Sequence, residues 1–369
     1  MRISQKTFDG RIASVRRRMA RVPVDLVVLG PGAHLQWLQG LHPHADERPF
    51  LFCLTQDDIA VLVPALEKDS LATQTDLPFF AWKDADGPQG SFAGLITHLK
   101  AAAVRHVALD ETMRADFAGL VHDHLPHAAF QFTASTVGAE RMRKDPEEYQ
   151  CLKRSALIAD CAMQETWSAM RPGLSEQEVA ERVRSSFAQH GAQPLFHIIG
   201  TGPNGAFPHH QTGGDLLKEG DAIVMDIGGT IDGYPSDITR MAVIGEAPDE
   251  YHEIHSIVEA AVEAALGVAR PGIPARQIDR AARQVIVDAG YGDFFLHRTG
   301  HGLGIEIHEP PDISGGSETI LDEGMVFSIE PGIYLPNRFG LRLEEIVMLR
   351  ADGPEILSDL PRDARIIDG

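Results

Sequence analysis

An internal repeat in the second part of the chain constrains the fold more than any other feature. The segment Arg171-Pro172-Gly173-Leu174 returns 99 residues later as Arg270-Pro271-Gly272-Ile273. A segment with helical spacing follows each copy, and these segments end at His190-Gly191 and Ala289-Gly290, which are also 99 residues apart. Two copies of one unit predict a domain with pseudo-two-fold symmetry.

The repeat continues into strand-like runs that end in acidic residues. Glu219-Gly220 and an apolar run precede Asp226-Ile227-Gly228, and 104 residues later Glu323-Gly324 and an apolar run precede Glu330-Pro331-Gly332. Each copy therefore carries a carboxylate at the same place on a strand. We expect the functional site to lie on the symmetry axis, where the two copies meet.

Two further carboxylates lie on the expected partner strands. Asp237 follows Asp226 by eleven residues, after a turn, and Glu344 follows Glu330 on the next strand-like segment. Hairpins would bring all four side chains to one spot, where burial and mutual repulsion make four ionised carboxylates unfavourable without cations. Two divalent ions bridged by carboxylates satisfy such a set better than one ion does.

The segment from residue 297 to residue 308 can supply imidazole ligands. It contains His297, His301 and His308 among several glycines, close in sequence to the second hairpin. Imidazole is a common metal ligand and also a common partner of the groups that orient such ligands. The sequence therefore predicts a dinuclear metal site built from carboxylates and histidine.

These motifs resemble the pita-bread metallopeptidases, the group that contains methionine aminopeptidases, aminopeptidase P and prolidase. The matching motifs are Met225-Asp226-Ile227-Gly228, Ser236-Asp237-Ile238-Thr239-Arg240, Gly300-His301-Gly302-Leu303-Gly304, Ser328-Ile329-Glu330-Pro331-Gly332 and Arg342-Leu343-Glu344. The resemblance covers the whole chain and implies an α/β protein of two domains. Residues 1–138 resemble the creatinase-like N-terminal domain of aminopeptidase P and prolidase, and residues 139–369 resemble the pita-bread domain.

Local patterns fit an α/β domain in the first part of the chain. Helical spacing at 5–20 and 95–103 alternates with strand-like runs at 24–29, 51–63 and 106–109. The run at 51–63 is interpreted as a hairpin. This domain has no strong catalytic signature of its own.

The joint between the domains is expected near the charged segment 141–148. Asp145 before Pro146 is a good helix N-terminus. A long helical pattern follows, from about residue 146 to residue 170.

The resemblance implies a role for each metal ligand. Asp226 is expected to bind one ion, His301 and Glu330 the other, and Asp237 and Glu344 both. Metal binding lowers the pKa of water towards neutrality, so a water molecule between the ions is the expected nucleophile. Manganese is the expected metal, with cobalt, zinc and iron as alternatives, because an oxygen-rich site with one imidazole suits all four.

The resemblance also implies roles in catalysis and substrate binding. Glu330 is expected to carry protons, His308 to stabilise the tetrahedral intermediate, and His209 to contact the peptide near the scissile bond. His297 and Arg342 are expected to bind substrate or to support the ligands.

Some of these side chains have a simpler interpretation as well. His209 and His308 could be hydrogen-bonded structural histidines. His210 is interpreted as a structural neighbour of His209, and Tyr334 either contacts substrate or is a packed aromatic side chain.

The implied reaction is hydrolysis of the bond between an N-terminal residue and proline. Aminopeptidase P acts on longer peptides and prolidase on dipeptides, and the length of 369 residues favours prolidase. Some prolidases hold the carboxylate of the dipeptide with an arginine just after the position of His308-Glu309, where this chain has Pro310-Pro311-Asp312. Asp312 would repel that carboxylate, so the sequence leaves the choice open.

Two other functions stay open. One is a hydrolase or lyase of the same fold that acts on a non-peptide small metabolite, because fold does not fix function. The other is a catalytically silent binding module. The complete set of five ligand positions argues against the binding module.

Composition restricts the partners and the location. The 53 acidic and 33 basic side chains give a net charge of −20, which disfavours binding to nucleic acid or to an anionic membrane. The chain has no run of eighteen apolar residues and no signal-peptide core, so a cytoplasmic protein is expected. Cys53, Cys151 and Cys161 give neither a disulfide framework nor a zinc motif.

The expected partners are proline-containing peptides and a second copy of the chain. A homodimer is typical of the resemblance. The segment His42-Pro43-His44-Ala45-Asp46-Glu47 is interpreted as an exposed loop, and in this family such loops can cap the active site of a partner subunit.

Overall fold

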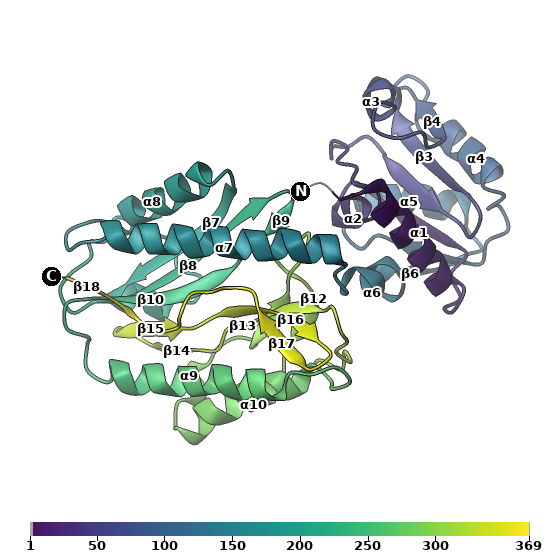
Figure 1. Ribbon diagram of the computed structural model, residues 1–369. Helices are drawn as coiled ribbons and strands as arrows, with labels where there is room; N and C mark the ends of the chain where they lie inside the picture. The colour runs from purple at the N-terminus through teal and green to yellow at the C-terminus, as the bar shows by residue number, and fades with distance from the viewer. Residues whose placement is uncertain (1–2, 369) are drawn as a thin grey trace. The chain divides into compact units, whose positions relative to one another are not determined.

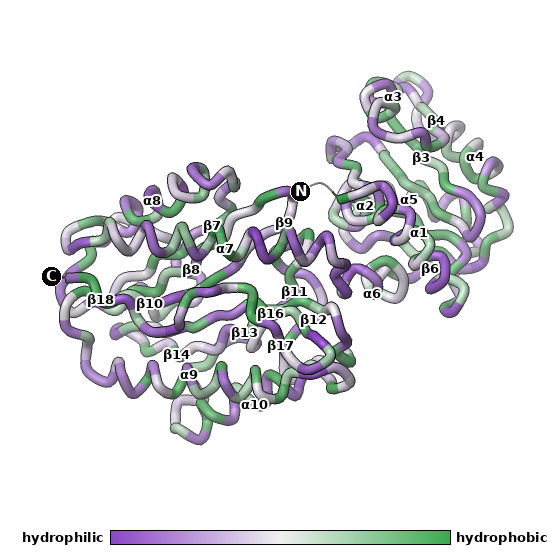
Figure 2. The backbone as a smooth tube through the Cα atoms, viewed as in Figure 1, coloured by the Kyte–Doolittle hydropathy of each residue, from purple (hydrophilic) through white to green (hydrophobic). Residues whose placement is uncertain are grey.

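The computed structural model describes residues 3–368, and the chain divides into two compact units between Arg141 and Met142. This division lies three residues after the boundary expected from the sequence. Each unit has a hydrophobic core of its own. Figure 2 shows the apolar residues running along the central strands of each unit.

The N-terminal unit is built on a mixed sheet with strand order β4-β3-β2-β1-β5-β6 (Figure 1). Its strands are β1 (Leu26–Leu29), β2 (Leu51–Leu54), β3 (Ile59–Pro64), β4 (Phe79–Trp82), β5 (His106–Leu109) and β6 (Ala129–Phe132). Its helices are α1 (Gln5–Met19), α2 (Ala33–Gln39), α3 (Ala65–Leu71), α4 (Gln89–His98), α5 (Ala115–His124) and α6 (Val137–Arg141). Every residue of β1 and β2 is buried, as expected for strands covered on both faces.

Most of the local predictions for this unit are confirmed. Helix α1, strands β1 and β5, and the antiparallel hairpin of β2 and β3 lie where the sequence places them. The helix expected at 95–103 is wrong in extent, because α4 begins at Gln89 and ends at His98. The chain leaves the helix at Lys100, whose φ of 53° is left-handed, and no glycine or asparagine marks that turn in the sequence.

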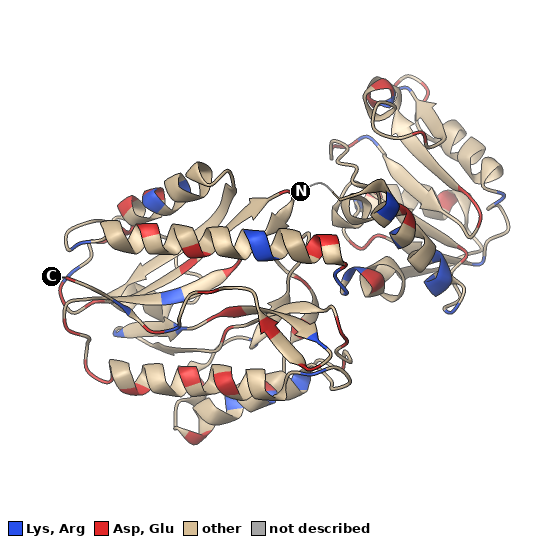
Figure 3. Cartoon of the chain, in the orientation of Figure 1, with Lys and Arg blue, Asp and Glu red and all other residues tan. Residues whose placement is uncertain are grey.

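The C-terminal unit contains the two copies of the repeat. The first copy comprises α7 (Pro146–Ala169), α8 (Glu176–Gln189), β7 (Gln193–Thr201), β8 (Ala222–Ile231) and β10 (Ile238–Ile244). The second comprises α9 (Tyr251–Val268), α10 (Arg276–Asp288), β11 (Gly300–Gly302), β13 (Val326–Ile329) and β16 (Glu345–Arg350). Figure 1 shows α7 and α8 on one side of the strands and α9 and α10 on the other. Acidic residues lie along the outer helices α7 and α9 (Figure 3).

Shorter strands complete the sheets of this unit. They are β9 (Tyr234–Pro235), β12 (Glu309–Ile313), β14 (Gly332–Leu335), β15 (Phe339–Arg342), β17 (Gly353–Ile356) and β18 (Arg365–Ile367). One sheet has the order β18-β10-β8-β7, with β9 paired to β8, and a second has the order β12-β11-β13-β16-β17. Strands β14 and β15 form a separate two-stranded ribbon.

Matching backbone hydrogen bonds confirm the repeat. The amide of Gly173 donates to the carbonyl of Leu217 at 2.8 Å, and the amide of Gly272 donates to the carbonyl of Leu321 at the same distance. The two glycines have left-handed φ values of 82° and 90°, which a residue with a side chain rarely adopts. The 99-residue spacing of the two motifs in the sequence therefore reflects a repeated backbone conformation.

Both predicted hairpins are present. Strand β8 pairs antiparallel with β10 and places Asp226 opposite Thr239, two residues after Asp237. Strand β13 pairs antiparallel with β16, and its last pair joins Ile329 to Glu345. Glu330 and Glu344 consequently lie one residue beyond the paired ends of their strands.

Helix α7 begins where the sequence predicts. The side chain of Asp145 accepts hydrogen bonds from the amides of Glu147 and Glu148, and the side chain of Glu148 accepts one from the amide of Asp145. This capping box satisfies amide groups that a helix N-terminus otherwise leaves without partners.

A close contact between two backbones fixes strand β15 beside the 3-10 helix η2 (Gly202–Ala206). A Cβ atom added to Gly340 would lie 1.8 Å from the carbonyl oxygen of Gly205. Because Arg342 lies two residues farther along the same strand, this contact helps to fix where Arg342 enters the site.

We predict that Gly340→Ala destabilises the protein by about 1–3 kcal/mol or more, because the methyl group forces two packed backbones apart. Thermal unfolding measures the effect. Gly214→Ala is the matched control, since no atom lies within 4 Å of its added Cβ. Equal melting temperatures for the two variants would contradict the prediction.

Candidate active site

One cavity of about 710 Å³ contains every residue that the sequence singled out for the site. Those residues are Asp226, Asp237, His301, Glu330, Glu344, His209, His297, His308 and Arg342. The remaining lining residues are Phe196, Ile198, Pro208, His210, Arg298 and Ile307. Strands of both copies of the repeat contribute to the cavity, so their carboxylates converge as predicted.

The carboxylates form two neighbouring groups that share one member. Asp226, Asp237 and Glu344 offer oxygen atoms within 4.8 Å of one another, and His301, Glu330 and Glu344 offer ligand atoms within the same limit. Asp237 also belongs to a group with His301 and His308. Adjacent groups with shared carboxylates are the arrangement that two bridged cations require.

The hydrogen bonds of His301 prepare it to bind a cation. Its Nδ1 lies 3.1 Å from the carbonyl oxygen of Gly302, which can only accept a hydrogen bond. In the neutral ring, Nε2 therefore carries the lone pair, and it faces Glu330 Oε1 at 3.3 Å and Asp237 Oδ2 at 3.6 Å. A lone pair directed at carboxylates is favourable when a cation lies between them.

Asp226 supplies an independent sign that the site suits a cation. Its Oδ2 accepts a hydrogen bond from Arg342 Nη2 at 2.6 Å. Its Oδ1 is buried and has no hydrogen-bond partner among residues 3–368. A buried carboxylate oxygen is costly without a partner, so the residues present fit divalent metal ions.

Burial and repulsion displace the pKa values of the carboxyl groups. Burial raises the pKa of Asp237 and of Glu344 well above the usual range, and neighbouring carboxylates raise them further. Burial also raises the pKa of Asp226, against the opposing charge of Arg342. For Glu330, burial is outweighed by the hydrogen bond and the charge that His301 supplies when its ring is protonated, and these lower the pKa of Glu330 to about 2. Without cations, this site is therefore electrostatically strained.

Two hydroxyl groups that the sequence did not indicate support the ligands. Thr239 Oγ1 donates to Glu344 Oε2 at 2.8 Å and accepts from Arg342 Nε at 3.0 Å. Ser328 Oγ donates to Glu330 Oε1 at 3.1 Å and accepts from the amide of His301 at 2.9 Å. Spacing was the only available signal, because Ser328 lies two residues before Glu330, and strand residues two apart share a face.

Arg342, Tyr334 and His297 form a chain of hydrogen bonds. Arg342 Nη1 donates to the hydroxyl of Tyr334 at 2.8 Å, and that hydroxyl lies 2.7 Å from His297 Nε2. His297 Nδ1 lies 2.7 Å from the carbonyl oxygen of Arg298, so Nδ1 donates and Nε2 accepts. Burial raises the pKa of Tyr334 to about 12 and lowers that of His297, which keeps both neutral.

Two of the secondary interpretations can now be compared with the structure. Tyr334 is 1% exposed and packed, and it does not line the cavity within the described part of the chain. His210 Nε2 lies 2.8 Å from the buried carboxylate of Glu176, which gives it a structural partner as expected.

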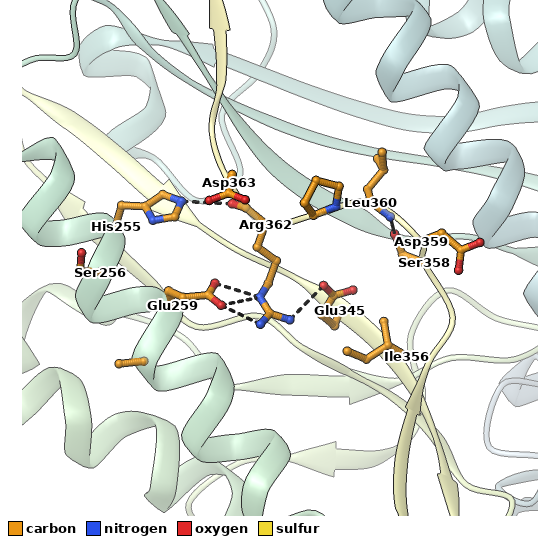
Figure 4. A pocket seen from close by; sticks show the side chains of 12 residues that line it. His255, Ser256, Glu259, Glu345, Ile356, Ser358, Asp359, Leu360, Arg362 and Asp363 are labelled. Atoms are coloured by element: carbon orange, nitrogen blue, oxygen red, sulfur yellow. Dashed lines mark hydrogen bonds and ion pairs between the residues drawn. The ribbon is translucent and has the colours of Figure 1, made fainter.

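A second cavity, of about 750 Å³, lies next to the same segment of backbone (Figure 4). Glu344 lines the first cavity and Glu345 the second. Arg240 is fully buried, and it donates to Glu345 Oε1 at 2.9 Å and to the carbonyl of Glu344. Arg240 also donates to the carbonyls of Leu360 and Pro361 at 2.8 and 2.9 Å. The hydrogen bonds of Arg240 thus fix the backbone at Glu344.

Another group of potential ligands lies in the N-terminal unit, but its histidine is already occupied. His34, Asp110 and Glu111 offer ligand atoms within 4.8 Å of one another. Arg141 Nη1 lies 3.2 Å from His34 Nδ1, so that nitrogen accepts, and Nε2 is left to donate to Glu111 at 3.3 Å or to Thr133 at 3.1 Å. Neither nitrogen is available for a cation.

Asp237→Asn is expected to abolish metal binding and activity together. The variant removes the charge of a ligand that groups with Asp226 and Glu344 and also with His301 and His308. We expect kcat to fall more than about 100-fold, since even groups behind the ligands cost 10–100-fold. Metal content by elemental analysis and peptide hydrolysis measure the two effects. Glu318→Gln, at a side chain 76% exposed, is the control. Full activity in Asp237→Asn would contradict the site.

Although Asp237→Asn should abolish activity, we expect it to stabilise the metal-free protein at high pH. A carboxyl group with a raised pKa contributes stability at pH values below its ordinary pKa and loses it as the pH rises through the folded value. Metal-free Asp237→Asn should therefore melt higher than metal-free wild type at pH 8, by about 2–4 °C per kcal/mol of repulsion removed. The two should melt alike near pH 4. A lower melting temperature for the variant at pH 8 would exclude this account.

No helix in the stretch from residue 3 to residue 368 combines the length and the apolar character needed to cross a membrane.

Comparisons with known proteins agree with the geometry. Residues 150–351 match the model of metallopeptidase family M24, and residues 11–144 match that of the creatinase/prolidase N-terminal domain. The chain is 34% identical over 373 residues to a probable dipeptidase PepE from Mycobacterium tuberculosis, with 99% of this chain and 98% of the relative covered. It is 29% identical over 358 residues to an Xaa-Pro dipeptidase from Pyrococcus horikoshii, with coverage of 96% and 99%.

A solved structure also matches along the whole chain. The crystal structure of dipeptidase PepE from Mycobacterium ulcerans has a TM-score of 0.94 and 32% identity, with all of both chains covered. The fold class expected from the sequence is confirmed.

Proposed function

This chain belongs to metallopeptidase family M24, and we propose that it hydrolyses the bond between an N-terminal residue and proline with two divalent metal ions. The observation that carries the proposal is the cavity in which Glu344 belongs to both groups of ligand atoms. We propose Asp226 for one ion, His301 and Glu330 for the other, and Asp237 with Glu344 for both.

The remaining groups of the cavity fit the steps of peptide hydrolysis. Bound divalent ions supply an activated water and polarise the scissile carbonyl. Glu330, held by Ser328 and His301, is placed to carry a proton from that water to the leaving nitrogen. Burial and the neighbouring charge of His301 lower the pKa of His308, so its neutral ring can donate one hydrogen bond to a developing oxyanion.

Apolar side chains at the same cavity fit the substrate. Phe196, Ile198, Pro208 and Ile307 line it, and an apolar wall with a few polar groups suits a small residue or a proline ring. His209 lines the cavity too, and we propose that it contacts the peptide near the scissile bond.

The ion pair of Asp312 supports a dipeptide substrate, against which the charge of Asp312 had been an objection. Arg298, which lines the cavity, forms an ion pair with Asp312. The negative charge is therefore balanced, and Arg298 can face the carboxylate of a dipeptide. Together with the dipeptidase names of the relatives, this favours a dipeptidase over an aminopeptidase P.

Substrate choice is tested with Ala-Pro, Ala-Pro-Ala and Ala-Ala-Ala, using metal-stripped protein with and without manganese. We expect metal-dependent cleavage of Ala-Pro and little release of alanine from the tripeptides. Efficient cleavage of Ala-Pro-Ala would instead identify an aminopeptidase P. If the metal-loaded protein cleaves none of the three, the peptidase proposal fails and a non-peptide metabolite becomes the candidate substrate. Cobalt, zinc and iron take the place of manganese in parallel assays.

Arg298→Ala should raise KM for Ala-Pro by about tenfold, because one charge-assisted hydrogen bond is worth about 1.5–3 kcal/mol. The KM for Ala-Pro-amide, which has no carboxylate, should change little. Arg338→Ala, at an exposed arginine that pairs with Glu250, serves as the control. Equal increases in KM for both substrates would show that Arg298 does not bind the carboxylate.

A homodimer in the cytoplasm remains our proposal for the state of the protein. The loop at residues 42–47 contains exposed side chains, including those of His42, His44 and Glu47. Analytical ultracentrifugation measures the oligomeric state.

A further inference from the structure

A buried ion pair lies outside the metal centre and is used by no step described above. Lys144 Nζ lies 2.6 Å from Glu309 Oε1, and the two side chains are 0% and 1% exposed. Lys144 belongs to the charged joint at 141–148, and Glu309 is 165 residues farther along the chain. Burying two charges is costly, and such a pair contributes little net stability compared with apolar side chains of the same size. Its presence therefore calls for another explanation.

The pair holds a segment that has neither helix nor strand. Residues 303–308 connect β11 to β12 without regular structure, and this segment carries His308. Glu309 Oε2 accepts a hydrogen bond from the amide of Glu306 at 3.2 Å, and the amide of Gly304 donates to the carbonyl of Glu306 at 3.0 Å. The carboxylate of Glu309 thus binds the backbone of its own segment through one oxygen atom. Its other oxygen atom binds Lys144, which lies outside the segment.

The space around the pair leaves little freedom of movement. A Cβ atom added to Gly304 would lie 2.4 Å from Glu309 Oε1 and 2.8 Å from Lys144 Cε. The backbone of Lys144 is itself fixed, because its amide donates to the carbonyl of Gly324 at 2.8 Å. Lys144 is therefore a rigid anchor.

Glu309 and His308 face different surroundings. Strand β12 alternates buried and exposed residues from its first position, where Glu309 is buried. His308 is exposed at the cavity, with its ring centroid 4.1 Å from that of His301. Fixing the side chain of Glu309 in the interior therefore fixes the direction in which His308 enters the cavity.

We propose that Lys144 is a positioning residue that acts through Glu309 to hold His308 in place beside the metal centre. The inference rests on the proposed function for its effect on catalysis, but the hold on residues 303–309 is independent of that function. Lys144 and Glu309 both belong to the C-terminal unit, so this unit itself supplies the group that sets the geometry of the active site.

The test uses the full chain and the double variant Lys144→Met/Glu309→Gln. This variant removes both charges, keeps side chains of similar length and leaves an acceptor for the amide of Glu306, so it should fold with a melting temperature near that of wild type. We expect kcat for Ala-Pro to fall about 10- to 100-fold, with KM changed less than about threefold and metal content unchanged.

A double-mutant cycle separates positioning from general stability. In a His308→Ala background, the double variant should lower kcat by no more than about twofold, because the group that it positions is gone. The matched control is Arg143→Met/Asp322→Asn, which removes the exposed ion pair of the neighbouring residue and should leave kcat unchanged. Wild-type kcat in the double variant, or the full loss again in the His308→Ala background, would overturn the inference.

Hydrogen exchange measured by mass spectrometry tests the inference without an assay. Exchange at residues 303–309 should speed up in the double variant and not in the control. If wild type cleaves no Xaa-Pro substrate, the proposed function fails, and this measurement alone decides the inference. Unchanged protection of residues 303–309 would then overturn it. If Lys144→Met alone fails to fold, that result reflects a buried carboxylate that has lost its cation, and the double variant, which carries neither charge, decides the inference.

Discussion

Repulsion among buried carboxylates is the constraint on which the C-terminal unit depends. Asp226 lies within strand β8, and Asp237, Glu330 and Glu344 each lie next to the end of a strand. Burial removes the water that would screen their charges. Arg342 and Thr239 act on this group from one side and His301 from the other. What repulsion remains is offset by cations, so metal affinity and the strain of the metal-free site have one physical origin.

The surrounding structure resists that repulsion mainly through the backbone. Arg240, which does not line the cavity within the described residues, donates to the carbonyl of Glu344. The close contact of Gly205 with Gly340 fixes the strand of Arg342. Ser328 joins the backbone of His301 to the side chain of Glu330. The ligands are therefore rigid before any ion arrives, which is the condition for a selective metal site.

The pseudo-two-fold fold of the C-terminal unit and its carboxylate ligands could be predicted from the sequence, because the two copies repeat similar motifs at nearly constant spacing. The repeats at 99 and 104 residues reflect equal backbone conformations, and four acidic residues on apolar strands indicate cations by elementary electrostatics. Thr239 and Ser328 could not be found in this way, since a hydroxyl residue on a strand is an ordinary occurrence. The C-terminal end of α4 was misplaced because the chain turns at Lys100 with a left-handed φ, a conformation that lysine rarely adopts.

Charges proved the least predictable from sequence alone. Asp312 was interpreted as repulsive because its partner Arg298 lies fourteen residues earlier and meets it only in the folded chain. Lys144 and Glu309 are separated by 165 residues, and nothing in either segment indicates the other. The sequence gives the sign of the charge on each side chain, but tertiary structure decides which charged side chains lie next to one another.

The hydrogen bonds of Arg240 impose an order on events during synthesis. Two of its acceptors, the carbonyls of Leu360 and Pro361, lie 120 and 121 residues after it in the chain. Until those residues leave the ribosome, the guanidinium group of a growing chain keeps its water, and the strands that carry Asp237 and Glu344 cannot close over it. The hydrogen bonds that fix Arg240 beside Glu344 are therefore completed only after residues 360 and 361 have emerged.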